Sequence, residues 1–175
     1  MRLNDMRSPS LLFLFLIISL LSCEEGEKSL TSNLTGNEVV YSLVQGSEYD
    51  ISGNITFKEK KDGSTLVDVA LSGTEGELYH PVHLHIGDIS IEDADLAAQL
   101  NPVYGKTGVS STNLKMLADE SIVTYNDLKN FTGCIKIHLS SAGPERDIIL
   151  AAGNIGKLST GISGGRLSIA TCKSE

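Results

Sequence analysis

The sequence predicts an all-β fold: a Greek-key β-sandwich or barrel with one long loop. Short runs of apolar residues that alternate with polar ones recur along the chain, and a period of two is typical of strands with one buried face. Turns that contain glycine separate these runs, and long helical patterns are few. Aromatic residues are also few. These features together favour a small sandwich or barrel.

Residues 1–22 have the pattern of an export signal, because Arg2 and Arg7 precede an apolar run that is short for a membrane span. The run ends in Leu20-Leu21-Ser22-Cys23, which resembles the lipobox of bacterial lipoproteins. This resemblance implies that Cys23 is diacylated and becomes the first residue of the mature chain. A plain signal peptide or a short core helix is the alternative interpretation.

The residues after Cys23 predict where the protein resides. Glu24, Glu25 and Glu27 form an acidic stretch that resembles signals carrying some lipoproteins to the outer face of the outer membrane, although a solvated tether has the same composition. We therefore expect a lipoprotein of the bacterial cell envelope that its lipid holds in the outer membrane, and the membrane face that it occupies stays open.

Charge excludes one class of partner. Residues 1–22 contain two arginines and one aspartate, a net charge of +1, so their removal changes the formal charge from −8 to −9. An acidic protein of this kind is a poor nucleic-acid binder. The expected partners are instead the membrane, through the lipid anchor, and a small anion; no protein partner is indicated.

The mature chain divides into a tether and one domain. Residues 23–46 are rich in serine, threonine, asparagine, glutamate and glycine, which bury little apolar surface, so we expect a flexible tether there. Residues 47–175, roughly 130 residues, are enough for a single domain.

Within this domain the strands follow one another in order. Residues 51–57 and 67–71 alternate in the manner of strands, and Lys60-Lys61-Asp62-Gly63 between them predicts a hairpin turn. Further strands are expected over residues 79–86, 134–139, 147–152 and 165–172. The connection over residues 87–133 is the long loop, with helical turns expected at 93–100 and, capped by Thr124, at 125–131.

All four histidines fall in two of the predicted strands. His83 and His85 are two residues apart, so both rings project from one face of a strand while the core takes the aliphatic face. His138 repeats this arrangement on a second strand. Three imidazoles on two strands can meet around one metal ion, and copper accepts such ligands readily, with zinc as the competing occupant. His80, before Pro81, is expected to be a hydrogen-bonding residue at the strand entry.

The cysteines support an oxidising compartment, in which exported proteins usually pair their thiols. Once Cys23 carries lipid, two cysteines remain: Cys134 opens the second histidine strand and Cys172 closes the final strand. If these strands are antiparallel neighbours, a Cys134–Cys172 disulfide would hold the histidine strand in position. Two buried thiols are the alternative.

The histidine strand also carries a family resemblance. Residues 75–88 read Glu-Gly-Glu-Leu-Tyr-His-Pro-Val-His-Leu-His-Ile-Gly-Asp, which resembles the copper-ligand strand H-G-F-H-V-H followed by G-D of copper/zinc superoxide dismutases. Residues 137–138 resemble that family's later V-H ligand, and residues 160–167 resemble its T-G-N-A-G-G-R-L segment. The resemblance implies a dismutase-type barrel and three copper ligands: His83, His85 and His138. It further implies that Arg166 guides the anion to copper, although a surface ion pair is the alternative role for this arginine, and that His80 supports the site.

The chain departs from this family in one respect. No histidine occurs between Asp88 and Ile137, so the family's bridging histidine and separate zinc site are absent. Residues 83–87, 137–140 and 151–156 are also similar to CHRD domains, which have no established enzymatic activity. We therefore expect a single copper and superoxide as substrate, with a non-catalytic CHRD-type module as the alternative. A hydrolase is not expected, because no serine or cysteine nucleophile is recognisably paired with these histidines.

Overall fold

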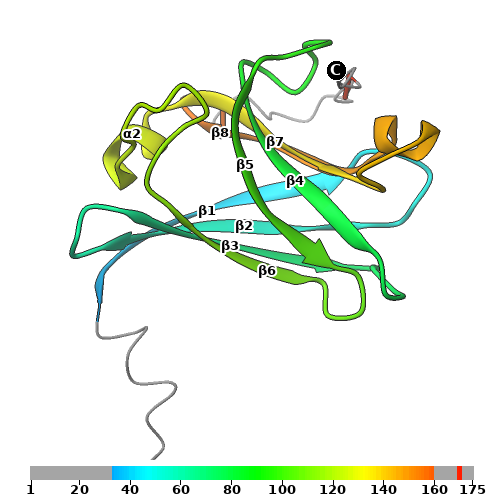
Figure 1. Cartoon of the computed structure of the whole chain (residues 1–175), viewed down its shortest axis with the longest axis horizontal. Coiled ribbons are helices and arrows are strands. Elements are labelled where there is room, and N and C mark those ends of the chain that lie inside the picture. Colours follow the sequence, from blue (N-terminus) through cyan, green and yellow to red (C-terminus); the bar gives the residue numbers. More distant parts are fainter. Residues whose placement is uncertain (1–32, 160–168, 171–175) are drawn as a thin grey trace, which may run out of the picture.

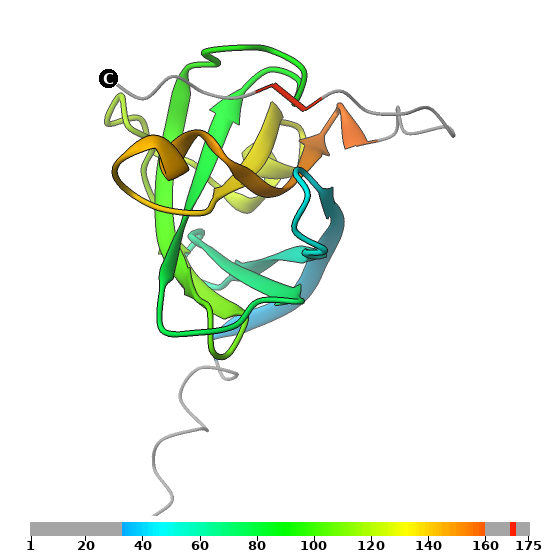
Figure 2. The same cartoon turned by 90° about the vertical axis from the view of Figure 1, so that its right-hand side faces the viewer.

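Eight antiparallel strands close into a barrel in the computed structural model, which describes residues 33–159 and 169–170 (Figures 1 and 2). The strands are β1 (Leu34–Gln45), β2 (Ser52–Lys60), β3 (Thr65–Ser72), β4 (Tyr79–Ile86), β5 (Leu96–Tyr104), β6 (Val109–Leu114), β7 (Thr132–His138) and β8 (Ile149–Gly156). A short helix, α2 (Tyr125–Lys129), and a 3-10 turn, η1 (Pro144–Asp147), lie in the connections of this part of the chain. The predicted all-β fold is confirmed.

The strand order makes the barrel a Greek key. Around the barrel the strands run β1-β2-β3-β6-β5-β4-β7-β8, and β8 pairs back to β1. The consecutive strands β4, β5 and β6 lie side by side. On one edge of this group β6 pairs with β3, and on the other edge β4 pairs with β7. Three consecutive strands flanked by a strand joined through a longer connection form the Greek-key arrangement. Figure 1 shows β5, β4 and β7 on one side of the barrel and β1, β2, β3 and β6 on the other.

The first strand corrects the predicted tether. Residues 34–45 were expected to be flexible, but they form β1, which pairs with β2 and β8. Tyr41 and Leu43 are buried and supply the apolar face, while most of the polar residues lie on the solvated face. A strand needs only alternate residues to be apolar, so a polar-rich segment can still be one. Residues 23–32 of the predicted tether lie outside the described residues.

The predicted long loop over residues 87–133 is also wrong, because it contains β5, β6 and α2. Residues 93–100 were expected to be a helical turn, yet β5 begins at Leu96 and pairs with β4. This pairing has two register shifts, so buried residues do not alternate evenly along β5 and the period of two is hidden. The helix capped by Thr124 is confirmed, since Thr124 and Asp127 form a reciprocal capping box.

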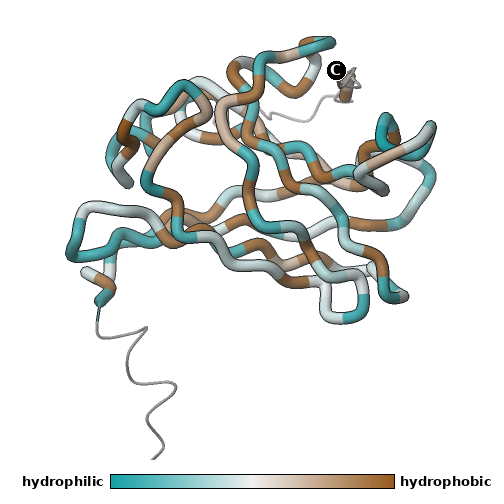
Figure 3. Tube along the Cα trace, in the orientation of Figure 1, coloured by the Kyte–Doolittle hydropathy of each residue, from teal (hydrophilic) through white to brown (hydrophobic). Residues whose placement is uncertain are grey.

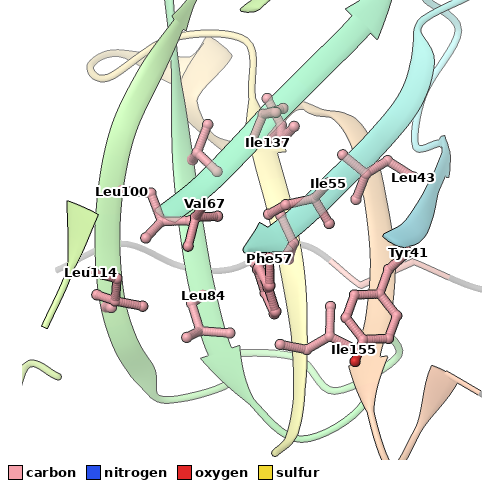
Figure 4. Close-up of a cluster of buried hydrophobic side chains, with 14 of the residues drawn as sticks. Tyr41, Leu43, Ile55, Phe57, Val67, Leu84, Leu100, Leu114, Ile137 and Ile155 are labelled. Carbon is pink, nitrogen blue, oxygen red and sulfur yellow. The ribbon is translucent and has the colours of Figure 1, made fainter. Parts of the chain in front are cut away.

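The core fills the inside of the barrel, and the outer faces of β7 and β8 are buried as well. Figure 4 shows aliphatic and aromatic side chains from several strands meeting there, among them Phe57, Val67, Leu84 and Ile137. The colours in Figure 3 alternate along many strands, as one inward and one outward face require. The predicted β2–β3 hairpin is confirmed, with eight paired positions from Ser52↔Ser72 to Glu59↔Thr65.

Candidate metal centre

Three histidines meet on the outer face of the β4–β7 pair. The two strands are antiparallel neighbours, with Val82 opposite Ile137 and His85 opposite Cys134. The inward positions of both strands carry aliphatic side chains that belong to the core: Val82, Leu84, Ile135 and Ile137. The outward positions carry His83, His85 and His138, so the alternation expected from the sequence gathers the imidazoles on one surface.

The three rings are close enough to share one ion. One nitrogen from each of His83, His85 and His138 lies within 4.8 Å of the other two. The ring centroids of His83 and His138 are 4.7 Å apart, and those of His83 and His85 are 5.7 Å apart. A metal bound at about 2.0–2.1 Å from each nitrogen holds such donors roughly 3.5 Å apart, which is within the 4.8 Å limit that the three nitrogens satisfy.

Backbone carbonyls orient two of the imidazoles. His85 Nδ1 lies 2.8 Å from the Ala94 carbonyl oxygen, and His138 Nδ1 lies 2.7 Å from that of Arg146. A carbonyl only accepts, so each Nδ1 carries the proton and each Nε2 presents a lone pair. The Nε2 of His138 is buried and has no hydrogen-bond partner among the described residues. A buried lone pair without a donor is suited to a metal ligand.

The surroundings keep all three imidazoles neutral. Burial, followed by the neighbouring His138 and His85, lowers the pKa of His83 to about 4. The pKa values of His85 and His138 are also lowered, mainly by burial and further by the charge of Lys136, while their bonds to backbone carbonyls act in the opposite direction. Neutral imidazole is the form that binds metal, so at pH 7 the site can bind an ion without first losing protons.

The histidines are more buried than the sequence suggested. We expected the imidazoles to be free on the polar face, but His85 is 3% exposed and His138 is 4% exposed. Neither belongs to the barrel core; both are covered by connections that lie over the outer face, as their bonds to Ala94 and Arg146 indicate. His83 is the more accessible of the three. Strand periodicity fixes the face of a side chain but does not reveal which loops cover it.

A polar network whose contacts the sequence did not predict lies beside the triad. Asn154 donates to Asp88 Oδ2 at 2.6 Å and accepts the backbone N–H of Ile89 at 3.0 Å. Lys136, which is 0% exposed, donates through Nζ to the carbonyls of Ile91 and Ala170. These bonds fasten the segment after β4 over the outer face of β7. Asn154 follows two alanines and a glycine, and nothing in this local sequence predicts its hydrogen bonds to Asp88 and Ile89.

The fourth histidine has a different role from the other three. His80 is 3% exposed, and its Nδ1 lies 3.0 Å from the carbonyl oxygen of Leu139. It is not part of the metal-competent group of three. This hydrogen bond ties the start of β4 to the end of β7, in agreement with the predicted structural role.

Three predicted residues lie outside the described residues: Cys23, Arg166 and Cys172. Their expected roles in lipidation, anion guidance and disulfide formation therefore stay predictions. Cys134 is buried on β7, where it packs with Ile89, Ile149 and Ala152.

No family model, curated protein or solved structure matches this chain. In the described part of the chain, none of the helices has the length and apolar character needed to span a membrane. What the structure contributes to function is therefore the three-histidine cluster itself. Its donor set consists of imidazoles alone, which suits copper and zinc.

Proposed function

We propose that this protein binds a single copper ion through His83, His85 and His138 and acts as a superoxide dismutase-like lipoprotein of the cell envelope. The observation that carries the proposal is the convergence of three neutral imidazoles, one with a buried Nε2 that lacks a partner among the described residues. The strand order, a Greek-key barrel with the ligand strands β4 and β7 side by side, agrees with the motif resemblance.

Copper bound to three imidazoles would supply a one-electron relay, because such ligands support both Cu(II) and Cu(I). The dismutation reaction needs only this relay and protons from water: two superoxide anions and two protons give one O2 and one H2O2. One electron passes from the first anion to the second, so no further oxidant or reductant is needed.

The chain's own residues would hold, orient and expose the ion. The carbonyls of Ala94 and Arg146 fix the rings of His85 and His138, and burial excludes water from them. His83 forms the more accessible edge, from which a small anion can approach. Lys136 contributes positive charge near the triad. We propose Arg166 as the residue that guides the anion, which the charge of −9 on the mature chain, −8 for the whole sequence less +1 for residues 1–22, would otherwise repel.

One observation favours a second candidate, a non-catalytic copper-holding or cell-surface module of the CHRD kind. Between Asp88 and Ile137 the sequence has no histidine, so no bridging imidazole can deliver a proton at the metal. Protons would have to come from water, which predicts slow or absent turnover. Copper binding is common to the enzyme and the copper-holding module, and only catalysis separates these two.

Metal content and superoxide decay test these candidates together. The purified protein is loaded with copper, its metal content is measured by mass spectrometry, and superoxide decay is followed by stopped flow. One copper per chain with accelerated decay supports the enzyme, and one copper without acceleration supports the binding module. His138→Gln should lose the copper, whereas the matched control His80→Gln, a histidine outside the cluster, should keep it. Absence of metal in the reconstituted protein would contradict the enzyme and the copper-holding module, and would leave only the cell-surface interaction role.

Envelope anchoring is a separate part of the proposal, supported by the lipobox-like residues 20–23. Expression in a bacterium with lipoprotein processing should give a mature chain that begins at Cys23 and carries acyl mass, and Cys23→Ala should abolish the added mass. An unmodified chain that stays in the soluble fraction would contradict the anchor.

A further inference from the structure

A buried cation lies beside the three-histidine cluster. The side chain of Lys136 is 0% exposed, and its Nζ donates hydrogen bonds to the carbonyl oxygens of Ile91 at 3.1 Å and Ala170 at 2.7 Å. Burial of a lysine is costly unless its charge has a function or good partners. These two bonds hold the ammonium in one location under the segment that follows β4.

The position of Lys136 on β7 makes it a direct neighbour of the proposed metal ligands. It is directly opposite His83 in the β4–β7 ladder, and it precedes His138 by two residues, so all three side chains share the outer face. Its charge lowers the pKa of both His85 and His138, and at each it acts more strongly than any other charged side chain. Lys136 therefore adds a positive contribution to the electrostatic potential at the triad, which the carbonyls of Ala94 and Arg146 oppose.

The three ligands carry no negative charge that could offset the charge of Lys136. Three neutral imidazoles bring no negative charge, unlike a site that contains carboxylates or thiolates. The carboxylate of Asp88 interacts electrostatically with Lys136, and hydrogen bonds from the Ser90 backbone and from Asn154 hold it in place beside the site. Each positive charge on a bound ion is therefore opposed by the same fixed ammonium.

From this juxtaposition we infer that Lys136 is a selectivity-determining residue, whose fixed charge makes the three-histidine site favour monovalent copper over divalent zinc. The inference rests on the proposed copper site and specifies the ion that this site prefers. The Lys136 ammonium repels a divalent ion twice as strongly as a monovalent one. An anionic co-ligand bound to the divalent ion reduces this repulsion. The same charge raises the reduction potential of a bound Cu(II)/Cu(I) couple.

The size of the effect follows from Coulomb's law. We take the ammonium to be about 8 Å from the ion, the spacing of diagonal neighbours on adjacent strands. At an effective dielectric constant of about 20, one unit charge at that distance changes a binding constant roughly 30-fold. Monovalent and divalent ions differ by one such charge. Removing the lysine charge should therefore raise Zn(II) affinity at least about tenfold more than Cu(I) affinity, after allowance for screening. The Cu(II)/Cu(I) potential should fall by about 60 mV for each tenfold change.

The test compares metal affinities of the purified protein and its variants. Cu(I) and Zn(II) dissociation constants are measured by competition with chromophoric chelators in Lys136→Met, which keeps the aliphatic stem, and Lys136→Gln, which keeps a hydrogen-bond donor. Lys58→Met is the matched control, since it removes the same charge from β2 on the other side of the barrel. A Zn(II) gain confined to the Lys136 variants supports the inference. Equal changes for both metals, or the same change in Lys58→Met, overturn it.

Measurements on the wild-type protein test the inference if the Lys136 variants do not fold or if no metal binds. If neither Lys136 variant keeps the wild-type circular dichroism spectrum, Zn(II) affinity of the wild type is measured with and without azide. The inference requires azide to tighten Zn(II) binding, and a lack of any effect overturns it. A protein that binds neither metal instead contradicts the proposed copper site, and the inference fails with it.

Discussion

The lowered pKa of His83 predicts that the metal-free protein loses stability as the pH falls from 6.5 towards 4. Folding keeps this imidazole neutral down to about pH 4, chiefly because it is buried and next to His138 and His85. In the unfolded chain the same group takes up a proton near pH 6.5. Between the two values the unfolded state binds more protons, so the free energy of unfolding decreases with every step to lower pH. Above pH 6.5 this contribution is fully present.

The magnitude can be worked out from the two pKa values. Each pH unit in the window is worth at most about 1.4 kcal/mol, so the span from 6.5 to about 4 corresponds to about 3 kcal/mol for an isolated, fully buried group. His83 is partly exposed, and screening by water reduces the expected loss to about 1–2 kcal/mol. His85 and His138, whose pKa values are also lowered, act in the same direction.

Urea unfolding of the metal-free protein at several pH values between 7.5 and 4.5 measures this loss. His83→Gln removes the titrating group and should flatten the pH dependence, so that wild type and variant converge at low pH. Carboxylates with a low pKa, such as Asp62 at about 2, lose their contribution only below this range. An identical pH dependence in wild type and His83→Gln would refute the reasoning and indicate that this ring is solvated.

Three further substitutions test the site, the polar network beside it and the cap of α2. His138→Ala should abolish copper binding, measured by chelator competition, and should cost about 1–3 kcal/mol in urea unfolding, because the buried ring and its bond to the Arg146 carbonyl are lost; unchanged copper affinity would contradict this. Asn154→Ala should cost about 2 kcal/mol and speed hydrogen exchange at Ile89, whose buried N–H loses its acceptor; unaltered exchange would speak against it. Thr124→Ala removes the α2 cap and should cost about 1 kcal/mol, while Thr124→Ser should cost little; equal effects of the two would rule out the cap.

Periodicity predicted the parts of the fold that follow a simple local rule. The alternation around His83 and His138 gave the correct outward face, because inward positions of β4 and β7 must be apolar to fill the barrel. The turn at residues 60–63 and the cap at Thr124 depend on residues a few positions apart, and both were predicted correctly. These elements are specified by their own segments.

Elements that depend on distant partners could not be predicted in this way. The polar-rich β1 is a strand because β2 and β8 offer it hydrogen-bonding edges, and β5 is irregular because its pairing with β4 shifts register twice. The burial of His138 arises from the connection that carries Arg146, and the burial of Lys136 from Ile91 and Ala170. Such contacts join residues separated by 8 to 45 positions, beyond the reach of a periodic pattern.

X-ray absorption spectroscopy of the copper-loaded protein measures the ligand set most directly. The expected spectrum contains three imidazole nitrogens at about 2.0 Å from copper, and one of them should disappear in each of His83→Gln and His85→Gln. The His80→Gln spectrum should equal that of the wild type. A spectrum with two or fewer imidazoles, or one that is unchanged by loss of any member of the triad, would contradict a three-histidine copper centre on the outer face of β4 and β7.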